Sequence, residues 1–160
     1  MPGESGFSGG PDERGAYDRK AVMRLAAVSG EQDLAEGLEQ AGLPLELDDL
    51  RPPEIGLAMV RGRIGGDGRP FNLGEMTVTR AAVRSQSGFT GFAYLEGRCP
   101  RRARLAAIVD ACWQDPASRA AVERYIAKPA ERRLEARRRR QAEQAAATKV
   151  DFFTMVRGED

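Results

Sequence analysis

The sequence predicts an α+β fold in which an antiparallel β meander is packed by an N-terminal helical hairpin and by C-terminal helices. Two observations predict it. Apolar residues recur at helical spacing in the N-terminal and C-terminal parts of the chain, and at alternate positions in the middle. The connections between the alternating runs are too short for the crossovers that parallel strands require. With 160 residues, the chain is long enough for one domain with a single core.

The N-terminal part is expected to hold a leader and two helices. Residues 1–15 are mostly Gly, Ser, Pro and charged residues with almost nothing to bury. We therefore expect a disordered leader ahead of a single domain over residues 16–160. Apolar spacing predicts one helix over residues 17–28 and a second over about residues 31–41, ending at Gly42.

Three strands are expected in the middle of the chain. Period-two alternation predicts them over residues 55–64, 76–85 and 89–96, with a tight turn at the GGDG sequence of residues 65–68. In the third strand both faces are apolar, because Phe92 lies on one face and Leu95 on the other. Both faces of the sheet should therefore be covered, either by the chain's own helices or, on one side, by a partner protein.

The C-terminal part is expected to be helical. Pro100 begins a helix with one apolar stripe suited to packing on the sheet, formed by Leu105, Ile108, Val109, Cys112 and Trp113. The opposite flank carries alanines around Asp110, which would let another backbone approach closely. A short helix is expected after Pro116, and a last one from Pro129 to about residue 147.

Composition excludes several classes of function. The chain has 25 Lys plus Arg against 24 Asp plus Glu, which argues against a generic polyanion binder. It has no histidine, so it cannot supply a Ser-His-Asp or Cys-His mechanism by itself. Cys99 and Cys112 fit no zinc pattern, and we expect no metal site. Free thiols and the lack of a long apolar run predict a cytoplasmic protein without a membrane span.

Arginines concentrate in the first predicted hairpin and indicate a candidate anion site. They are Arg61, Arg63, Arg69, Arg80 and Arg84. Arginine forks match phosphate and phosphonate oxygens, so Arg63, Arg80 and Arg84, with Glu75 to orient them, are the candidate substrate-binding residues. The alternative is that each arginine is exposed or pairs with Glu54, Asp67 or Glu75, which we favour for any single one of them. The glycines here do not form a P-loop, because no P-loop lysine and no helix follow them.

Two C-terminal features remain. The arginine run at residues 137–140 lies on a mostly charged helix, which favours a solvated helix over a nucleic-acid element. The chain ends VDFFTMVRGED, and we treat Phe152, Phe153, Met155 and Arg157 as partner-interface candidates. Either this tail anchors the chain in a neighbouring subunit, or it forms a final strand on its own sheet.

Three stretches of the sequence resemble the PhnG family, a subunit of the bacterial carbon-phosphorus lyase complex. They are GLAMVRGRIGGDGRPFNLGEMTVTRAAVR at residues 56–84, GFAYLEGR at residues 91–98 with LAAIVDACWQD at residues 105–115, and VDFFTMVRGED at residues 150–160. The chain departs from the family where Val22 and Met23 stand in place of a usual Trp-Met pair.

The resemblance implies a function within an assembly. Family members act with PhnI, PhnH and PhnL to form α-D-ribose 1-methylphosphonate 5-triphosphate, as a phosphonate displaces adenine from ATP. They also belong to a core complex with PhnH, PhnI and PhnJ, in which PhnJ cleaves the carbon-phosphorus bond by iron-sulfur radical chemistry. ATP and phosphonate are thus substrates of the assembly, no cofactor is expected on this chain, and little or no activity is expected from it alone.

Two other functions remain open. The chain could be a purely structural subunit with no substrate contact, its arginines and tail binding only partner subunits. Less favoured is a nucleic-acid-binding module that uses the arginine run at residues 137–140.

Overall fold

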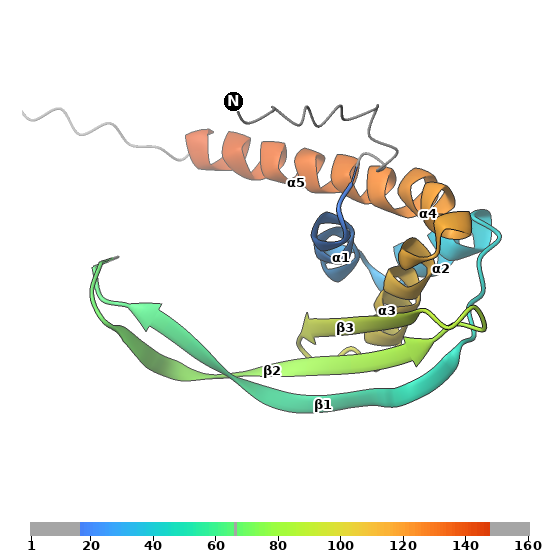
Figure 1. Cartoon of the computed structure of the whole chain (residues 1–160). Helices are drawn as coiled ribbons and strands as arrows, with labels where there is room; N and C mark the ends of the chain where they lie inside the picture. Colours follow the sequence, from blue (N-terminus) through green and yellow to red (C-terminus); the bar gives the residue numbers. More distant parts are fainter. Residues whose placement is uncertain (1–16, 66, 148–160) are drawn as a thin grey trace, which may run out of the picture.

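A computed structural model describes residues 17–65 and 67–147 of the chain (Figure 1). The predicted leader and the C-terminal tail, with Phe152, Phe153, Met155 and Arg157, lie outside the described residues. In chain order the elements are α1 (Arg19–Val28), α2 (Glu31–Gln40), β1 (Asp48–Arg63), β2 (Pro70–Arg84), β3 (Thr90–Glu96), α3 (Pro100–Gln114), α4 (Pro116–Val122), a π-helical turn η1 (Glu123–Ala127) and α5 (Lys128–Ala147).

The three strands form one antiparallel sheet in the order β1-β2-β3, so the predicted α+β meander is confirmed. Its first two strands are longer than predicted, since β1 begins at Asp48 and β2 at Pro70. The early part of β1 contains Pro52 and Pro53, which hide the strand pattern. An edge strand tolerates proline because one row of its backbone groups has no partner, and the register of β1 is irregular at this point.

Helix boundaries follow local chemistry closely. The Asp18 carboxylate accepts a hydrogen bond of 2.6 Å from the backbone N–H of Ala21 and so caps α1. Helix α2 ends just before Gly42, whose φ of 64° is the left-handed conformation that stops a helix. Pro100 begins α3, as predicted.

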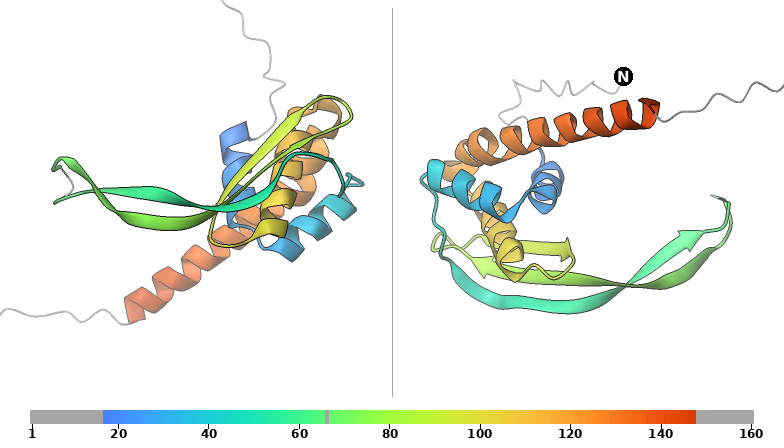
Figure 2. Two further views of the ribbon diagram at one scale, coloured as in Figure 1. Left: turned by 90° about the horizontal axis from the view of Figure 1, so that it is seen from below. Right: turned by 180° about the vertical axis from the view of Figure 1, so that it is seen from behind.

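All the described helices lie on one side of the sheet (Figures 1 and 2). Helix α3 packs on β2 and β3, and α1 and α2 pack on α3. Within the described chain the other face has no helix over it, and Phe92 and Tyr94 there are 50% and 59% exposed. The expectation that the chain's own helices would cover both faces is therefore wrong. The partner alternative for the second face stays open.

The core lies between α3, the inner face of the sheet and the first two helices. Leu25, Leu38, Val83 and Ile108 are fully buried representatives of it. The predicted stripe of α3 is buried except for the half-buried Trp113, but the closest approach to the sheet is made by the alanine flank.

Gly91 allows that close approach. A Cβ atom built on Gly91 of β3 would lie 1.9 Å from the carbonyl oxygen of Ala107 and 2.5 Å from the backbone nitrogen of Ala111. No side chain fits there, so β3 and α3 are in direct backbone contact. The alanine flank functions as predicted.

Beyond the end of β3, the first two strands continue alone as a curved two-stranded ribbon (Figures 1 and 2). Val78 of β2 pairs with Glu96, the last residue of β3, so the part of the hairpin before Val78 has no third strand. We call residues 55–77 the arm, which includes at its base Ile55 and Gly56, the partners of Thr79 and Val78 at the end of the three-stranded region. Its register shifts between Val60 and Arg61, where Leu73 is the extra residue on β2.

Candidate functional site

The candidate anion-binding residues do not converge. Arg63 pairs with Pro70 next to the turn of the arm, whereas Arg80 pairs with Tyr94 and Glu54 over the body of the sheet. Ten residues of extended strand separate Pro70 from Arg80, which corresponds to about 30 Å. Arg63 and Arg80 therefore cannot contact one phosphonate or triphosphate group together within this chain.

Arg80 has the partner that the alternative interpretation predicted. Its Nε lies 3.1 Å from Oε2 of Glu54, and both side chains are about half exposed. The same carboxylate lies 3.9 Å from Nη1 of Arg51. Arg80 points outward rather than into an apolar core, so this is an exposed ion pair of small energetic value.

The other candidates are dispersed and exposed. Arg84 lies at the end of β2 and makes no ion pair among the described residues. Arg63 donates from Nη1 to the carbonyl oxygen of Gly68 at 3.1 Å. Glu75 pairs with Met59 across the arm and is also exposed. The sequence correctly placed Arg80 and Arg84 on one face, but these four residues do not make one site in this chain.

We call the three-stranded part of the sheet with its helices the body. In the body, the buried carboxylate of Asp110 joins α3 to α1 and to β3. It is 1% exposed, and its two oxygens each accept a hydrogen bond of 2.8 Å from the guanidinium of Arg19. Oδ2 also accepts from the backbone N–H of Phe92 at 2.9 Å. The hydrogen bond to Asp110 raises the pKa of Arg19, against the lowering effect of burial. An acid this well satisfied is structural.

Asp110 also covers the edge of the sheet. The free edge of β3 offers the N–H of Phe92 and the carbonyl of Thr90. Asp110 accepts from the first, and Nε2 of Gln114, one helical turn later, donates to the second at 2.7 Å. Two side chains of α3 therefore occupy backbone groups that could otherwise pair with another strand. An Asp among buried alanines was the sequence signal for this role.

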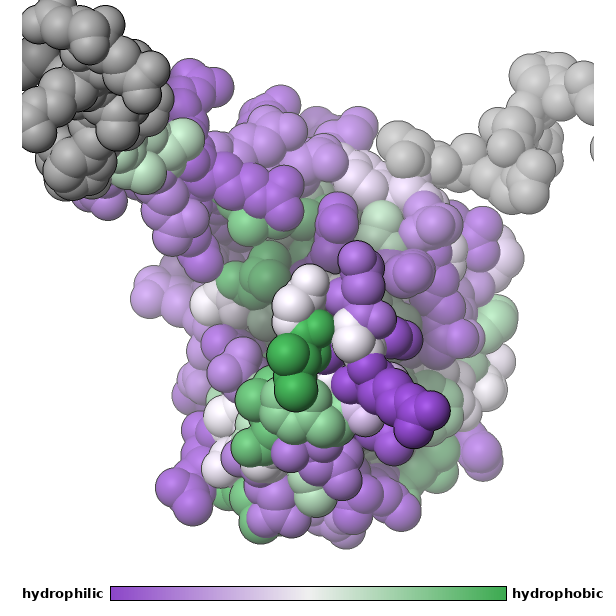
Figure 3. Space-filling view, turned by 90° about the vertical axis from the view of Figure 1, so that its left-hand side faces the viewer, coloured by the Kyte–Doolittle hydropathy of each residue, from purple (hydrophilic) through white to green (hydrophobic). Residues whose placement is uncertain are grey.

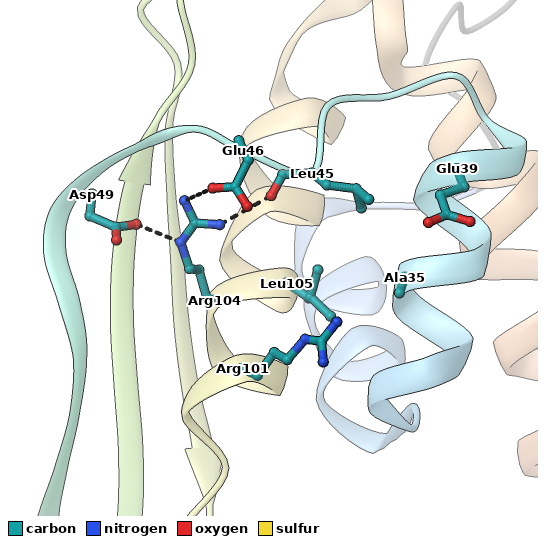
Figure 4. Close-up of a pocket in the computed structure, with 8 residues that line it drawn as sticks. All are labelled: Ala35, Glu39, Leu45, Glu46, Asp49, Arg101, Arg104 and Leu105. Atoms are coloured by element: carbon teal, nitrogen blue, oxygen red, sulfur yellow. Dashed lines mark hydrogen bonds and ion pairs between the residues drawn. The ribbon is translucent and has the colours of Figure 1, made fainter.

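A depression of about 400 Å³ lies between α2, α3 and the segment before β1 (Figure 4). Two arginines line it: Arg101 is largely exposed and lies 3.4 Å from Glu31, whereas Arg104 donates to the carbonyls of Leu45 and Leu47. Arg104 also lies 2.9 Å from Glu46 and 2.8 Å from Asp49. Four of the five N–H donors of this guanidinium have acceptors, so it ties the segment to α3. Arg104 was not singled out by the sequence.

The described residues offer neither a metal site nor a reactive thiol at Cys112. Across residues 17–65 and 67–147, no group of three or more His, Cys, Asp or Glu side chains could hold a metal ion. Cys112 is buried, and burial raises the pKa of its thiol to about 11, with a smaller contribution from Asp115. Such a thiol is a poor nucleophile. None of the helices in these residues is of a length and hydrophobicity that could span a membrane.

The arginine run at residues 137–140 lies on the second half of α5, where every residue is exposed. This agrees with the predicted solvated helix. Arg132, Arg139 and Arg140 line a shallow depression together with Glu135, so one acidic group lies among three basic ones there. Binding of nucleic acid by this helix stays a prediction that the sequence does not favour.

The most unusual surface of the described chain is the arm. Six of its large apolar side chains are between 40% and 73% exposed, namely Ile55, Leu57, Met59, Ile64, Phe71 and Leu73. Seen from the arm's side of the molecule, apolar side chains gather in the centre among hydrophilic ones (Figure 3). The period-two pattern correctly predicted a strand here. It did not reveal that no part of the described chain covers these side chains.

Comparison with known proteins decides the family. A family model described as phosphonate metabolism protein PhnG matches residues 17–158. The chain belongs to the PhnG family. It is also 50% identical over 149 residues to the alpha-D-ribose 1-methylphosphonate 5-triphosphate synthase subunit PhnG of Rhizobium meliloti (strain 1021), covering 93% of this chain and 95% of that protein.

The longest stretch on which the PhnG resemblance rests, residues 56–84, comprises most of the arm and the rest of β2. Only the second half of this stretch contributes to the core. In this PhnG family member, the candidate functional site is therefore an exposed surface rather than an enclosed pocket.

Proposed function

We propose that this chain is a non-autonomous subunit of an α-D-ribose 1-methylphosphonate 5-triphosphate synthase. Family membership and the relative from Rhizobium meliloti, which is described as a subunit of that synthase, support the proposal. The chain acts with PhnI, PhnH and PhnL in this reaction and with PhnJ in the core complex that cleaves the carbon-phosphorus bond. The assembly works in the cytoplasm during phosphonate catabolism.

The exposed apolar arm is the observation that carries the proposal. Soluble proteins that act alone rarely expose a contiguous apolar surface, because each such side chain is more stable out of water. Six large apolar side chains lie on one ribbon that the described helices do not cover. This arrangement fits a subunit that contributes surface to an assembly.

A direct role in chemistry has less support. In the proposed reaction a phosphonate oxygen bonds to the anomeric carbon, the bond from that carbon to adenine breaks, and adenine leaves with a proton. A site for this step needs cationic groups that converge on the phosphonate or triphosphate. Arg63 and Arg80 are about 30 Å apart along the hairpin, since ten extended residues separate them. We therefore assign catalysis to other subunits.

Reconstitution tests the proposal. The complete assembly is incubated with ATP and methylphosphonate, and adenine release is compared with an assembly prepared without this chain. We expect release only when the chain is present, and none from the chain alone. Equal release without it, or release by the isolated chain, would contradict the proposed function.

A further inference from the structure

The arm has two unlike faces. Ile55 pairs with Thr79, which is buried beneath the helices, so Ile55, Leu57 and Met59 lie on the helix side of the sheet. These side chains are 49%, 64% and 54% exposed. On the opposite face β1 carries the smaller Gly56, Ala58 and Val60, and β2 carries Phe71 and Leu73 beside Gly62. On β1, the bulky row is thus confined to the helix side of the ribbon.

Helix α3 does not reach this row. Its contact with β1 is made near the beginning of that strand, where Arg104 pairs with Asp49. From there the ribbon runs away from the described helices (Figures 1 and 2). Ile55, Leu57 and Met59, at alternate positions of a ribbon that the described helices do not cover, form a docking surface. A partner polypeptide typically buries a surface of this kind.

The end of the arm is basic, and its arginines have no carboxylate partner among the described residues. Arg61 donates to the amide oxygen of Asn72 at 3.4 Å, and Arg63 donates to the carbonyl of Gly68. Arg69 is exposed. Asp67 is the only acid between them in sequence. By contrast, Arg80 at the other end of the hairpin is paired with Glu54.

We propose that the helix-side face of the arm binds an amphipathic, acidic segment of another subunit. Apolar side chains of that segment pack on Ile55, Leu57 and Met59, while its carboxylates pair with Arg61, Arg63 and Arg69. The inference rests on the proposed function, because it names the partner chemistry of the same exposed surface. Charge complementarity indicates the kind of partner. The arginines at the end of the arm would be paired by carboxylates, whereas a purely apolar partner would leave these arginines without counter-charges.

A second copy of this chain is a poorer occupant. The arm carries Arg61, Arg63 and Arg69 against Asp67 and Glu75, so two arms brought together double the positive surplus. Like charges placed opposite one another oppose association. Pairing of two arms is therefore disfavoured, and an acidic segment of another subunit is the better match.

Two arm variants of the full chain test the inference. For each, we measure binding to an assembly that was prepared without this chain. The first, Ile55→Thr/Leu57→Thr/Met59→Thr, removes the apolar row but keeps strand propensity. The second, Arg61→Glu/Arg63→Glu/Arg69→Glu, reverses the charge. Each is expected to raise the dissociation constant for the assembly at least about 100-fold. Added salt should weaken wild-type binding, whereas it should strengthen the residual binding of the charge-reversed variant, because salt screens the repulsion between its glutamates and the partner's carboxylates.

Matched controls lie elsewhere on the chain. Arg138→Glu/Arg139→Glu/Arg140→Glu makes the same charge change on the exposed half of α5, and Gly56→Ala adds one methyl group to the opposite face of the arm without a close contact. Both controls should bind within about threefold of wild type. Circular dichroism and thermal unfolding establish that each variant is folded.

The possible failures are distinguishable. If the wild-type chain joins the assembly and supports adenine release while either arm variant binds within about threefold of it, the docking inference is overturned and the proposed function stands. An equal loss in the α5 control also overturns the inference. If the wild-type chain itself neither joins the assembly nor affects adenine release, the proposed function fails as well.

Discussion

The two halves of strand β2 show how one strand can belong to two different surfaces. Thr79 and Val83 lie under α3 and are fully buried, whereas Leu73 is 62% exposed on the arm. Both halves pair antiparallel with β1, with register shifts near Pro52 and Pro53 in the body half and between Val60 and Arg61 on the arm. Local strand chemistry is therefore similar, and the difference is the presence of a helix over one half. Burial in the body is produced within this chain, while none of the described residues covers the apolar side chains of the arm.

The contact between Gly91 of β3 and helix α3 should be the part of the body most sensitive to substitution. Gly91→Ala places a Cβ atom 1.9 Å from the carbonyl oxygen of Ala107, so β3 and α3 must separate. We expect a loss of about 3 kcal/mol in the free energy of unfolding, measured by urea titration. Gly56→Ala on the arm is the matched control, since nothing lies within 4 Å of its added Cβ atom, and it should cost nothing measurable. Equal effects would remove the distinction between body and arm.

The buried carboxylate of the body should have the next largest effect. Asp110→Ala leaves the N–H of Phe92 without its acceptor, while the partly exposed Arg19 regains water. We expect a cost of about 2 kcal/mol in the free energy of unfolding. Glu54→Ala, which breaks the exposed pair with Arg80, should cost less than about 1 kcal/mol. A reversed order of these two losses would contradict the account.

Alkaline pH should lower the free energy of unfolding, because the Tyr17 hydroxyl loses its proton and with it the hydrogen bond to Glu131. The hydrogen bond that its hydroxyl donates to Glu131, at 2.5 Å, is the main cause that raises the pKa of Tyr17 from 10.0 to about 12. A raised folded-state pKa favours the protonated form, so its stabilising effect is complete below pH 10 and is lost as pH rises towards 12. The contribution is about 1 kcal/mol because the site is partly exposed.

Comparison with Tyr17→Phe isolates that effect. The difference in unfolding free energy between wild type and variant should shrink between pH 10 and pH 12. A constant difference over this range would show that the hydrogen bond to Glu131 does not link stability to pH.

Changes on the arm should have the smallest effect on stability. Ile55, Leu57 and Met59 gain little from folding of the isolated chain because they remain about half exposed. Their replacement by threonine should change the free energy of unfolding by less than about 0.5 kcal/mol and should improve solubility. Thermal and urea unfolding measure the first, and light scattering measures the second. A loss of more than about 2 kcal/mol would mean that this chain itself buries the arm.

Much of the fold follows from local signals. The helix ending at Gly42, the helix beginning at Pro100 and the three antiparallel strands were all predictable from the sequence. The start of β1 was not, because Pro52 and Pro53 interrupt the pattern in a way that only an edge strand permits. Whether a strand lies at the edge is a tertiary property.

The candidate site was less predictable, for two physical reasons. Alternation shows which side chains share a face, but not whether a helix of the same chain covers that face. Leu57 and Val83 both follow the pattern, and only Val83 is buried. Proximity in sequence also does not make side chains converge. Arg63 and Arg80 lie in one hairpin, yet Arg63 is beside the turn and Arg80 is far from it, as strand spacing alone implies.

Amide hydrogen exchange of the chain, free and within the assembly, tests the central contrast most directly. In the free chain, residues 78–83 of β2 should exchange slowly and the arm, residues 55–77, should exchange faster. On assembly, protection should rise at least about tenfold in the arm and remain unchanged in residues 78–83. An arm that exchanges equally fast in both states would contradict the claim that a partner subunit covers it.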